Sequence, residues 1–145
     1  MSLLDKSNQN FEIAEDAAKK GYFDTAVSRL YYSSFQRMNN FIDQRKSNNV
    51  QKITTSDNQI LGILGKGNIN QLGSHEKKFL ELCQYDNSMI SIMSYIINMK
   101  IQRKIADYKE QHIIEQEYQN IKIQAEFINN LSLIHISEPT RLLSI

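Results

Sequence analysis

The stretch FEIAEDAAKKGYFDTAVSRLYYSSFQRMNNFI, residues 11–42, decides the fold class. Its second half contains mainly apolar residues spaced three or four positions apart, which is the period of a buried helical face. The residues of this stripe are Val27, Leu30, Tyr31, Ser34, Phe35, Met38, Phe41 and Ile42. The opposite positions are polar, so the stripe predicts an amphipathic helix that begins near Asp24.

The first half of the same stretch predicts another helix, over about residues 7–20. Apolar residues three and four positions apart mark its buried face. Ser7 or Asn8 is the expected N-cap. Gly21 follows the last turn, at the position where a left-handed C-cap residue is expected.

The rest of the chain also shows helical periodicity and no alternating strand pattern. Residues 46–58 are polar and predict a loop, and residues 59–73 predict a short helix with an irregular turn. Residues 74–108 carry a helical stripe that is interrupted at residues 85–88, so one kinked helix or two helices are expected. Residues 113–131 form a seven-residue apolar seam suited to a partner helix. Together these segments predict an all-α antiparallel bundle of four to five helices.

The composition fits one domain with an ordinary core. The chain has 145 residues, 41% of them hydrophobic, and a formal net charge of +1. A net charge of +1 does not indicate a nucleic-acid-binding protein, although a protein with this net charge can still carry a local basic patch. Cys83 is the only cysteine, so an intrachain disulfide is excluded and a small buried thiol is expected. No leader peptide or membrane span is expected, and a cytoplasmic location is the default.

The last residues, LSLIHISEPTRLLSI from position 131 to 145, differ from the rest. They contain the only proline and break the apolar seam. The string resembles the peptide produced when a cloning adapter is translated in frame. We therefore expect a helical domain over residues 1–131 and a non-native or disordered tail over residues 132–145, and we exclude the tail from functional reasoning. A continuous native reading frame in the resequenced gene would contradict this hypothesis.

Three sequence motifs resemble the HEPN family of helical proteins. The first covers the Gly-Tyr-x-Asp-x-Ala and Ser-Arg-x-Tyr-Tyr patterns of that family and a following aromatic residue. Its matching residues are Gly21, Tyr22, Asp24, Ala26, Ser28, Arg29, Tyr31, Tyr32 and Phe35. The second is LGILGKGNINQLG at residues 61–73, and the third is IQRKIADY at residues 101–108. The last two are similar to a small HEPN subgroup, whose signature is Arg-x-x-Ala-Asp-Tyr.

The resemblance implies a helical bundle that forms a homodimer and needs neither metal nor cofactor. Many HEPN proteins are metal-independent ribonucleases, and many pair with a minimal nucleotidyltransferase. The resemblance thus implies a component of a prokaryotic toxin–antitoxin or defence system that acts on or binds RNA. A non-catalytic module that binds a nucleotide or a partner protein is the alternative, and a plain interaction bundle is a third interpretation.

The family motif also implies a candidate catalytic set. HEPN ribonucleases carry Arg-x4-6-His, in which arginine holds a phosphate and histidine transfers a proton. Here Arg103 would hold the phosphate, Asp107 would orient Arg103, and Tyr108 or His112 would assist. His112 lies nine residues after Arg103, which in a continuous helix is a rotation of roughly 180° and a rise of about 13 Å. A break after Tyr108, or a second subunit, would be needed to bring the two together.

Arg29, Tyr32 and Lys104 are candidate binding residues. Arg29 and Tyr32 are three apart and lie off the apolar stripe, so they could line a groove with Arg103. Convergence of Arg29, Arg103 and Lys104 in one cleft would favour phosphate binding, and scattering would favour the interaction bundle. His75 has no metal-ligand spacing and is expected at the surface. Lys66 lies in a Gly-rich stretch that lacks the spacing and the Ser/Thr of a phosphate-binding loop.

Overall fold

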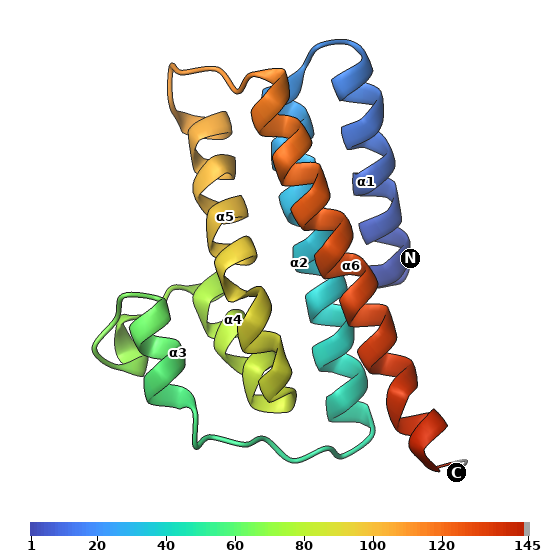
Figure 1. Cartoon of the computed structure of the whole chain (residues 1–145), viewed down its shortest axis with the longest axis vertical. Helices are drawn as coiled ribbons and strands as arrows, with labels where there is room; N and C mark the ends of the chain where they lie inside the picture. Colours follow the sequence, from blue (N-terminus) through green and yellow to red (C-terminus); the bar gives the residue numbers. More distant parts are fainter. Residues whose placement is uncertain (144–145) are drawn as a thin grey trace.

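The computed structural model describes the backbone of residues 1–143 and the side chains of residues 1–130. It is all-α, with no strand in the described range, and this confirms the predicted fold class (Figure 1). The α-helices are α1 (Leu3–Lys19), α2 (Phe23–Ser47), α3 (Asp57–Ile63), α4 (Ser74–Tyr85), α5 (Met93–Tyr108) and α6 (Glu115–Leu143). Short 3-10 helices cover Ile69–Gln71 and Asn87–Ile92. The number of α-helices exceeds the predicted four to five, because residues 74–108 form two helices.

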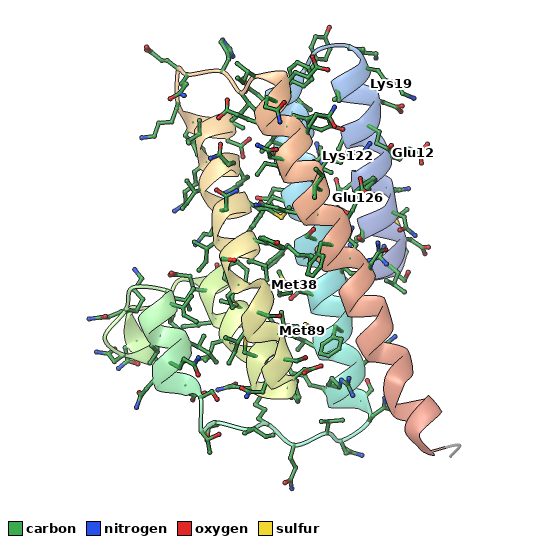
Figure 2. The ribbon with its side chains drawn as sticks, viewed as in Figure 1. Glu12, Lys19, Met38, Met89, Lys122 and Glu126 are labelled. Atoms are coloured by element: carbon green, nitrogen blue, oxygen red, sulfur yellow. The ribbon has the colours of Figure 1, made fainter. Side chains whose placement is uncertain are left out.

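Helix α2 is the centre of the bundle. It packs against α1, α4, α5 and α6, so it has few exposed faces (Figure 1). Every residue of the predicted stripe on α2 is buried except Phe35, which is partly buried. Met38 of this stripe lies in the interior, as does Met89 from the segment between α4 and α5 (Figure 2). The three- and four-residue spacing therefore identified the face of α2 that is covered by its neighbours.

Helix α1 begins earlier than predicted. Ser2 is the N-cap: its hydroxyl accepts a hydrogen bond from the Asp5 amide at 3.1 Å, and the Asp5 carboxylate accepts one from the Ser2 amide at 3.3 Å. The prediction that Ser7 or Asn8 caps the helix is wrong, because both lie inside it. Ser7 is buried, and its hydroxyl donates to the Ser33 carbonyl of α2 at 2.7 Å. Gly21 has φ of 79°, so the predicted left-handed turn between the two helices is confirmed.

Residues 74–108 form two helices separated by a short 3-10 segment, which resolves the two alternatives left by the sequence. The Asp86 side chain accepts a hydrogen bond from the Ser88 amide at 3.0 Å and so starts the 3-10 segment. Helices α4 and α5 then run in opposite directions (Figure 1). Cys83 of α4 is buried, and burial raises the pKa of its thiol to about 12, so it remains an uncharged core residue as predicted.

The seam of the last helix is buried in part as expected. Tyr118, Ile121, Ala125 and Ile128 are buried, whereas Ile114 is exposed and its neighbour Ile113 is buried in its place. The helix does not end near Leu131, since α6 extends to Leu143. The tail hypothesis concerns residues 132–145, whose side chains lie outside the described residues, and it stays a prediction. Within the described part of the chain, none of the helices combines the length and the apolar character that crossing a membrane requires.

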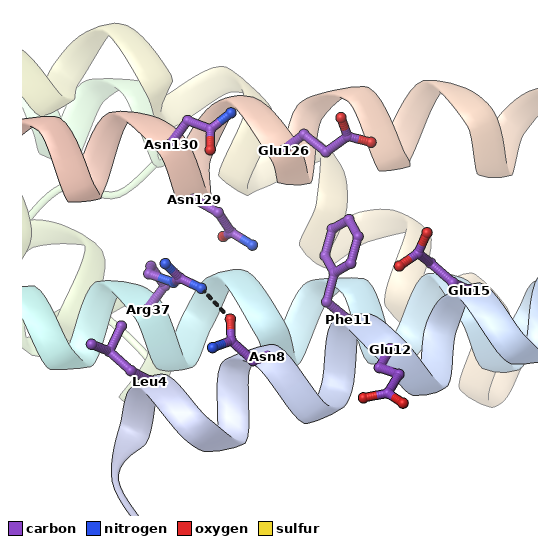
Figure 3. A pocket seen from close by; sticks show the side chains of 9 residues that line it. All are labelled: Leu4, Asn8, Phe11, Glu12, Glu15, Arg37, Glu126, Asn129 and Asn130. Carbon is purple, nitrogen blue, oxygen red and sulfur yellow. Dashed lines mark hydrogen bonds between the residues drawn. The ribbon is translucent and has the colours of Figure 1, made fainter.

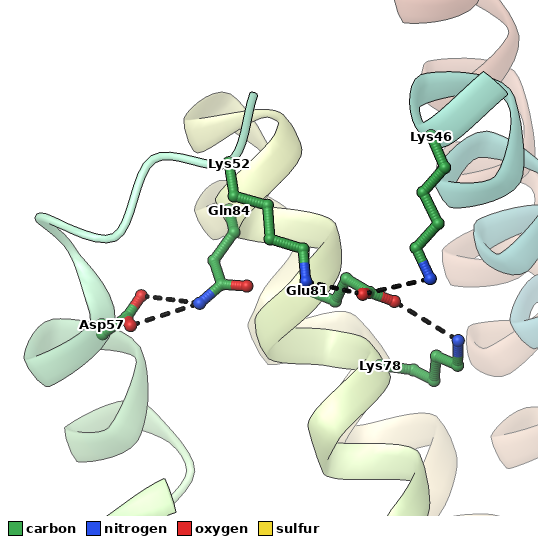
Figure 4. A network of polar contacts seen from close by, with 6 residues as sticks. All are labelled: Lys46, Lys52, Asp57, Lys78, Glu81 and Gln84. Carbon is green, nitrogen blue, oxygen red and sulfur yellow. Dashed lines mark hydrogen bonds and ion pairs between the residues drawn. The ribbon is translucent and has the colours of Figure 1, made fainter. Parts of the chain in front are cut away.

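The carboxylate of Glu81 on α4 connects α4 to the end of α2 and to the loop that follows it. Glu81 is 15% exposed and lies 3.3 Å from the Lys46 ammonium, 2.9 Å from that of Lys52 and 3.3 Å from that of Lys78 (Figure 4). Burial alone would raise the pKa of Glu81, but hydrogen bonds from Lys52 and Lys78 lower it below the ordinary value of 4.5. The ionised carboxylate thereby ties the end of α2 and the following loop to α4.

Glu81→Gln is expected to lower the free energy of unfolding by about 1 kcal/mol at neutral pH, because three ammonium groups lose their shared counter-charge. The contribution of a carboxylate with a lowered pKa is complete above its unfolded-state pKa and is lost as the pH falls through its folded-state pKa. The difference between the two proteins should therefore shrink below pH 4.5. Urea unfolding at several pH values measures it, and a difference that persists at about pH 3 would contradict the assignment.

Candidate functional site

Arg103 of α5 lies against two tyrosines of α2. Its guanidinium donates a hydrogen bond to the Tyr32 hydroxyl at 2.5 Å. The guanidinium carbon is 5.2 Å from the centre of the Tyr32 ring and 6.0 Å from that of Tyr31, within the range of cation–π attraction. The side chain is mostly covered, so its planar fork is held in one orientation.

Asp107 lies one turn after Arg103, and the pairing expected from this spacing is present. The Arg103 Nε atom is 3.1 Å from Asp107 Oδ2, although the N–H does not point at the oxygen well enough to form a hydrogen bond. The Ser28 hydroxyl of α2 also donates to Asp107, at 3.4 Å. Asp107 therefore supplies charge beside Arg103 and connects the end of α5 to α2.

His75 is part of this site, although the sequence placed it at the surface. It lies in the first turn of α4 and is half-buried. Its Nδ1 atom is 2.6 Å from the hydroxyl of Tyr31, and its ring stacks on Phe35 with 4.2 Å between the ring centres. The signal was present in the sequence, because His75 precedes the buried Phe79 by one helical turn and so shares its face.

Burial and nearby positive charges favour the neutral form of the His75 ring. Burial lowers the pKa of His75, and the positive charges of Lys100, Arg103 and Lys104 lower it further. Burial raises the pKa of Tyr31, so the phenol stays protonated. Burial lowers the pKa of Lys100, and nearby positive charges that include Lys104 and Arg103 lower it further. The Glu76 carboxylate raises this pKa but does not offset the other effects. A neutral imidazole thus lies beside a concentration of positive charge on α5.

The imidazole of His75 is expected to titrate with a midpoint below its ordinary value of 6.5. Lys100→Gln should raise that midpoint, because it removes one of the positive charges that oppose protonation. The measurement is the pH dependence of the His75 ring signals in NMR spectra of both proteins. A midpoint at or above 6.5 in the unmodified chain would contradict this description of the site.

The three predicted binding residues border two separate hollows. Arg29 and Tyr32 line one of about 300 Å³, together with Thr25, Ser28 and Asp107. Lys104 lines another of about 170 Å³, beside Lys100 and Phe79. Arg29 donates a hydrogen bond to Asn10 of α1 at 3.2 Å and makes no described contact with Arg103. Arg103 lines neither hollow, although it contacts Tyr32 and Asp107 of the first. Arg29, Arg103 and Lys104 therefore do not meet in one cleft, and by the test given above this favours the interaction bundle.

Tyr108 and His112 occupy different positions. Tyr108 is 72% exposed, and its ring centre is 5.6 Å from the Arg103 guanidinium carbon. Helix α5 ends at Tyr108, as an approach of His112 to Arg103 would require. The 88% exposed His112 instead has its Nδ1 atom 2.8 Å from the Asp24 carboxylate, which also accepts a hydrogen bond from the Ile113 amide. His112 thus binds the α5–α6 linker to the start of α2.

The described residues contain no candidate metal site, and the comparisons with known proteins give no match. Among the residues that the structure describes, no group of three histidine, cysteine or acidic side chains is arranged to hold a metal ion. In comparisons with known proteins, no family model, no curated protein and no solved structure matches the chain. The HEPN resemblance rests on the three sequence motifs and stays a prediction.

Proposed function

We propose that the chain is a HEPN-like protein that binds RNA through its phosphates at the face formed by Lys100, Arg103 and Lys104. The observation that supports this most is the group of three positive charges near His75, in which the Arg103 guanidinium is held by its hydrogen bond to Tyr32. Arginine presents a planar fork that matches a phosphate, and two lysines beside it add attraction for the neighbouring phosphates. Tyr32 and Asp107 hold the fork in position before RNA arrives.

The same arrangement suits cleavage of RNA. A neutral His75 can accept the proton of a ribose 2′-hydroxyl as its oxygen attacks the adjacent phosphorus. The bond from phosphorus to the 5′-oxygen then breaks, leaving a 2′,3′-cyclic phosphate and an alcohol. Arg103 would stabilise the extra negative charge on the phosphate oxygens, and the exposed Tyr108 hydroxyl would give a proton to the departing 5′-oxygen. In this proposal His75 takes the role that the family motif gives to a histidine after Arg103.

The biological setting follows from the resemblance alone. It implies a homodimeric component of a prokaryotic toxin–antitoxin or defence system, with a nucleotidyltransferase-type protein as a candidate partner. A non-catalytic module that binds a nucleotide or that partner is the second candidate function. The observation that favours it is His112, which is paired with Asp24 and has no described contact with Arg103.

The proposal is tested by incubating labelled single-stranded RNA with the purified full chain in the presence of EDTA. A His75→Gln variant serves as the comparison, and binding is followed separately by fluorescence anisotropy. Cleavage to 2′,3′-cyclic phosphate ends that disappears in the variant, while binding remains, would support the nuclease. Binding without cleavage by either protein would support RNA binding and contradict the nuclease step. Absence of binding over a range of RNAs would overturn the proposal.

A further inference from the structure

We infer that the groove between α1 and α6 binds a small aliphatic molecule with a carboxylate at one end and an ammonium group at the other. The groove has a volume of about 660 Å³, and α2 forms its floor through Arg37 (Figure 3). It involves none of the residues of the Arg103 site. The inference is therefore independent of the proposed function.

The first observation is a buried positive charge with no counter-charge. Arg37 is 7% exposed, and its guanidinium donates to the Ser7 hydroxyl at 3.3 Å and to the Asn8 side-chain oxygen at 2.7 Å. Both partners are neutral, and among the described residues no carboxylate lies within ion-pair distance of it. Burial lowers the pKa of Arg37, yet an arginine keeps its proton in proteins. An uncompensated buried charge is costly, so an anionic group entering the groove would stabilise it.

The same end of the groove has further hydrogen-bond donors. The second terminal nitrogen of Arg37 makes no hydrogen bond within the described residues, and the Asn8 side-chain amide group also has none. Asn130 of α6 adds another exposed amide to the lining. Figure 3 shows Arg37, Asn8 and Asn130 gathered at one end of the groove. This set suits the two oxygens of a carboxylate, which accept hydrogen bonds from a guanidinium and from amides.

The second observation is the opposite charge at the other end. Glu126 of α6 lines the groove there and is exposed, whereas the carboxylate of the exposed Glu12 lies on the side of α1 away from α6 (Figure 3). Neither forms an ion pair within the described part of the chain, whereas the neighbouring Glu15 lies 3.4 Å from the ammonium of Lys122. The unpaired carboxylate of Glu126 favours a cation at this end of the groove.

The spacing of the two ends selects the length of the molecule. Glu126 and Asn130 are one turn apart on α6, so the ends are separated by about 6 Å along the helix. The Phe11 ring lies between them and offers an apolar wall (Figure 3). A chain of several methylene groups joining a carboxylate to an ammonium group fits this order of anion site, apolar wall and cation site.

The probe for this site is 6-aminohexanoate, titrated into the full chain and followed by NMR. Saturable shifts of the Asn8 and Asn130 side-chain amides are expected, with a dissociation constant on the order of 1 mM. Hexanoate and hexylamine carry only one of the two charges, and each is expected to bind at least about tenfold more weakly, since each loses charge-assisted hydrogen bonds at one end.

Two variants separate binding from folding. Arg37→Met retains the aliphatic stem and should abolish the shifts. If it does not fold, Glu126→Gln at the exposed end is the decisive variant, and it should weaken binding of 6-aminohexanoate while leaving that of hexanoate unchanged. Equal binding of all three compounds, no saturable shift at the groove, or an unchanged affinity in Glu126→Gln would overturn the inference.

Discussion

Replacing Arg103 by alanine is expected to weaken RNA binding by at least about tenfold. The loss follows from the removal of a charge-assisted contact to phosphate, which typically contributes about 1.5–3 kcal/mol. Removing one phosphate contact should also lower the slope of log affinity against log salt concentration by about one. Fluorescence anisotropy of a labelled RNA at several salt concentrations measures both effects. Arg103→Lys keeps the charge but loses the fork that Tyr32 orients, so an intermediate affinity is expected.

The matched control is Lys6→Ala, which removes one positive charge from an exposed position near the start of α1. If attraction by total charge alone explained binding, Lys6→Ala would weaken it as much as Arg103→Ala does. That result would contradict a defined site, as would an unchanged affinity of Arg103→Ala. Circular dichroism of each variant shows whether the bundle is intact, because Arg103 also connects α5 to Tyr32 of α2.

Periodicity in the sequence predicted the buried face of α2 and most of that of α6, because burial in a helix repeats every three to four residues. The stripe on α2 is the clearest case. Periodicity does not show which helices face one another, so the proximity of Tyr31 on α2 to His75 on α4 could not be predicted from it. Their contact depends on the packing of two helices that are far apart in the sequence.

The candidate site was therefore predicted in its local part only. Arg103 and Asp107 pair because one turn of a single helix brings them together, and spacing is sufficient to predict that. Helix α5 ends at Tyr108, which leaves its ring exposed beside Arg103. His112 follows the helix end, so its position depends on the path of a linker that Asp24 fixes.

Phe79→Ala is expected to lower the free energy of unfolding by about 3–5 kcal/mol, the range found when a fully buried phenylalanine is truncated. Phe79 is inaccessible to solvent, and its ring meets Phe35 edge to face with 6.3 Å between ring centres. It also lines the hollow of about 170 Å³ beside Lys100, so truncation would enlarge an existing space rather than allow the helices to close. Small domains are stable by only about 5–15 kcal/mol, so this loss is a large fraction of the total. Urea unfolding followed by circular dichroism measures it.

Phe127→Ala is the control, because Phe127 is 49% exposed on α6 and contacts only one described aromatic ring, that of Tyr95. Its truncation should cost about 1 kcal/mol or less. Phe35 joins Phe79 to His75, so Phe79→Ala should also loosen the imidazole and move its NMR titration midpoint back toward 6.5. A loss of stability no larger than that of Phe127→Ala would show that Phe79 is not a core residue. If Phe79→Ala lowers the free energy of unfolding as expected but leaves the titration midpoint of His75 unchanged, the core and the candidate site are energetically separate.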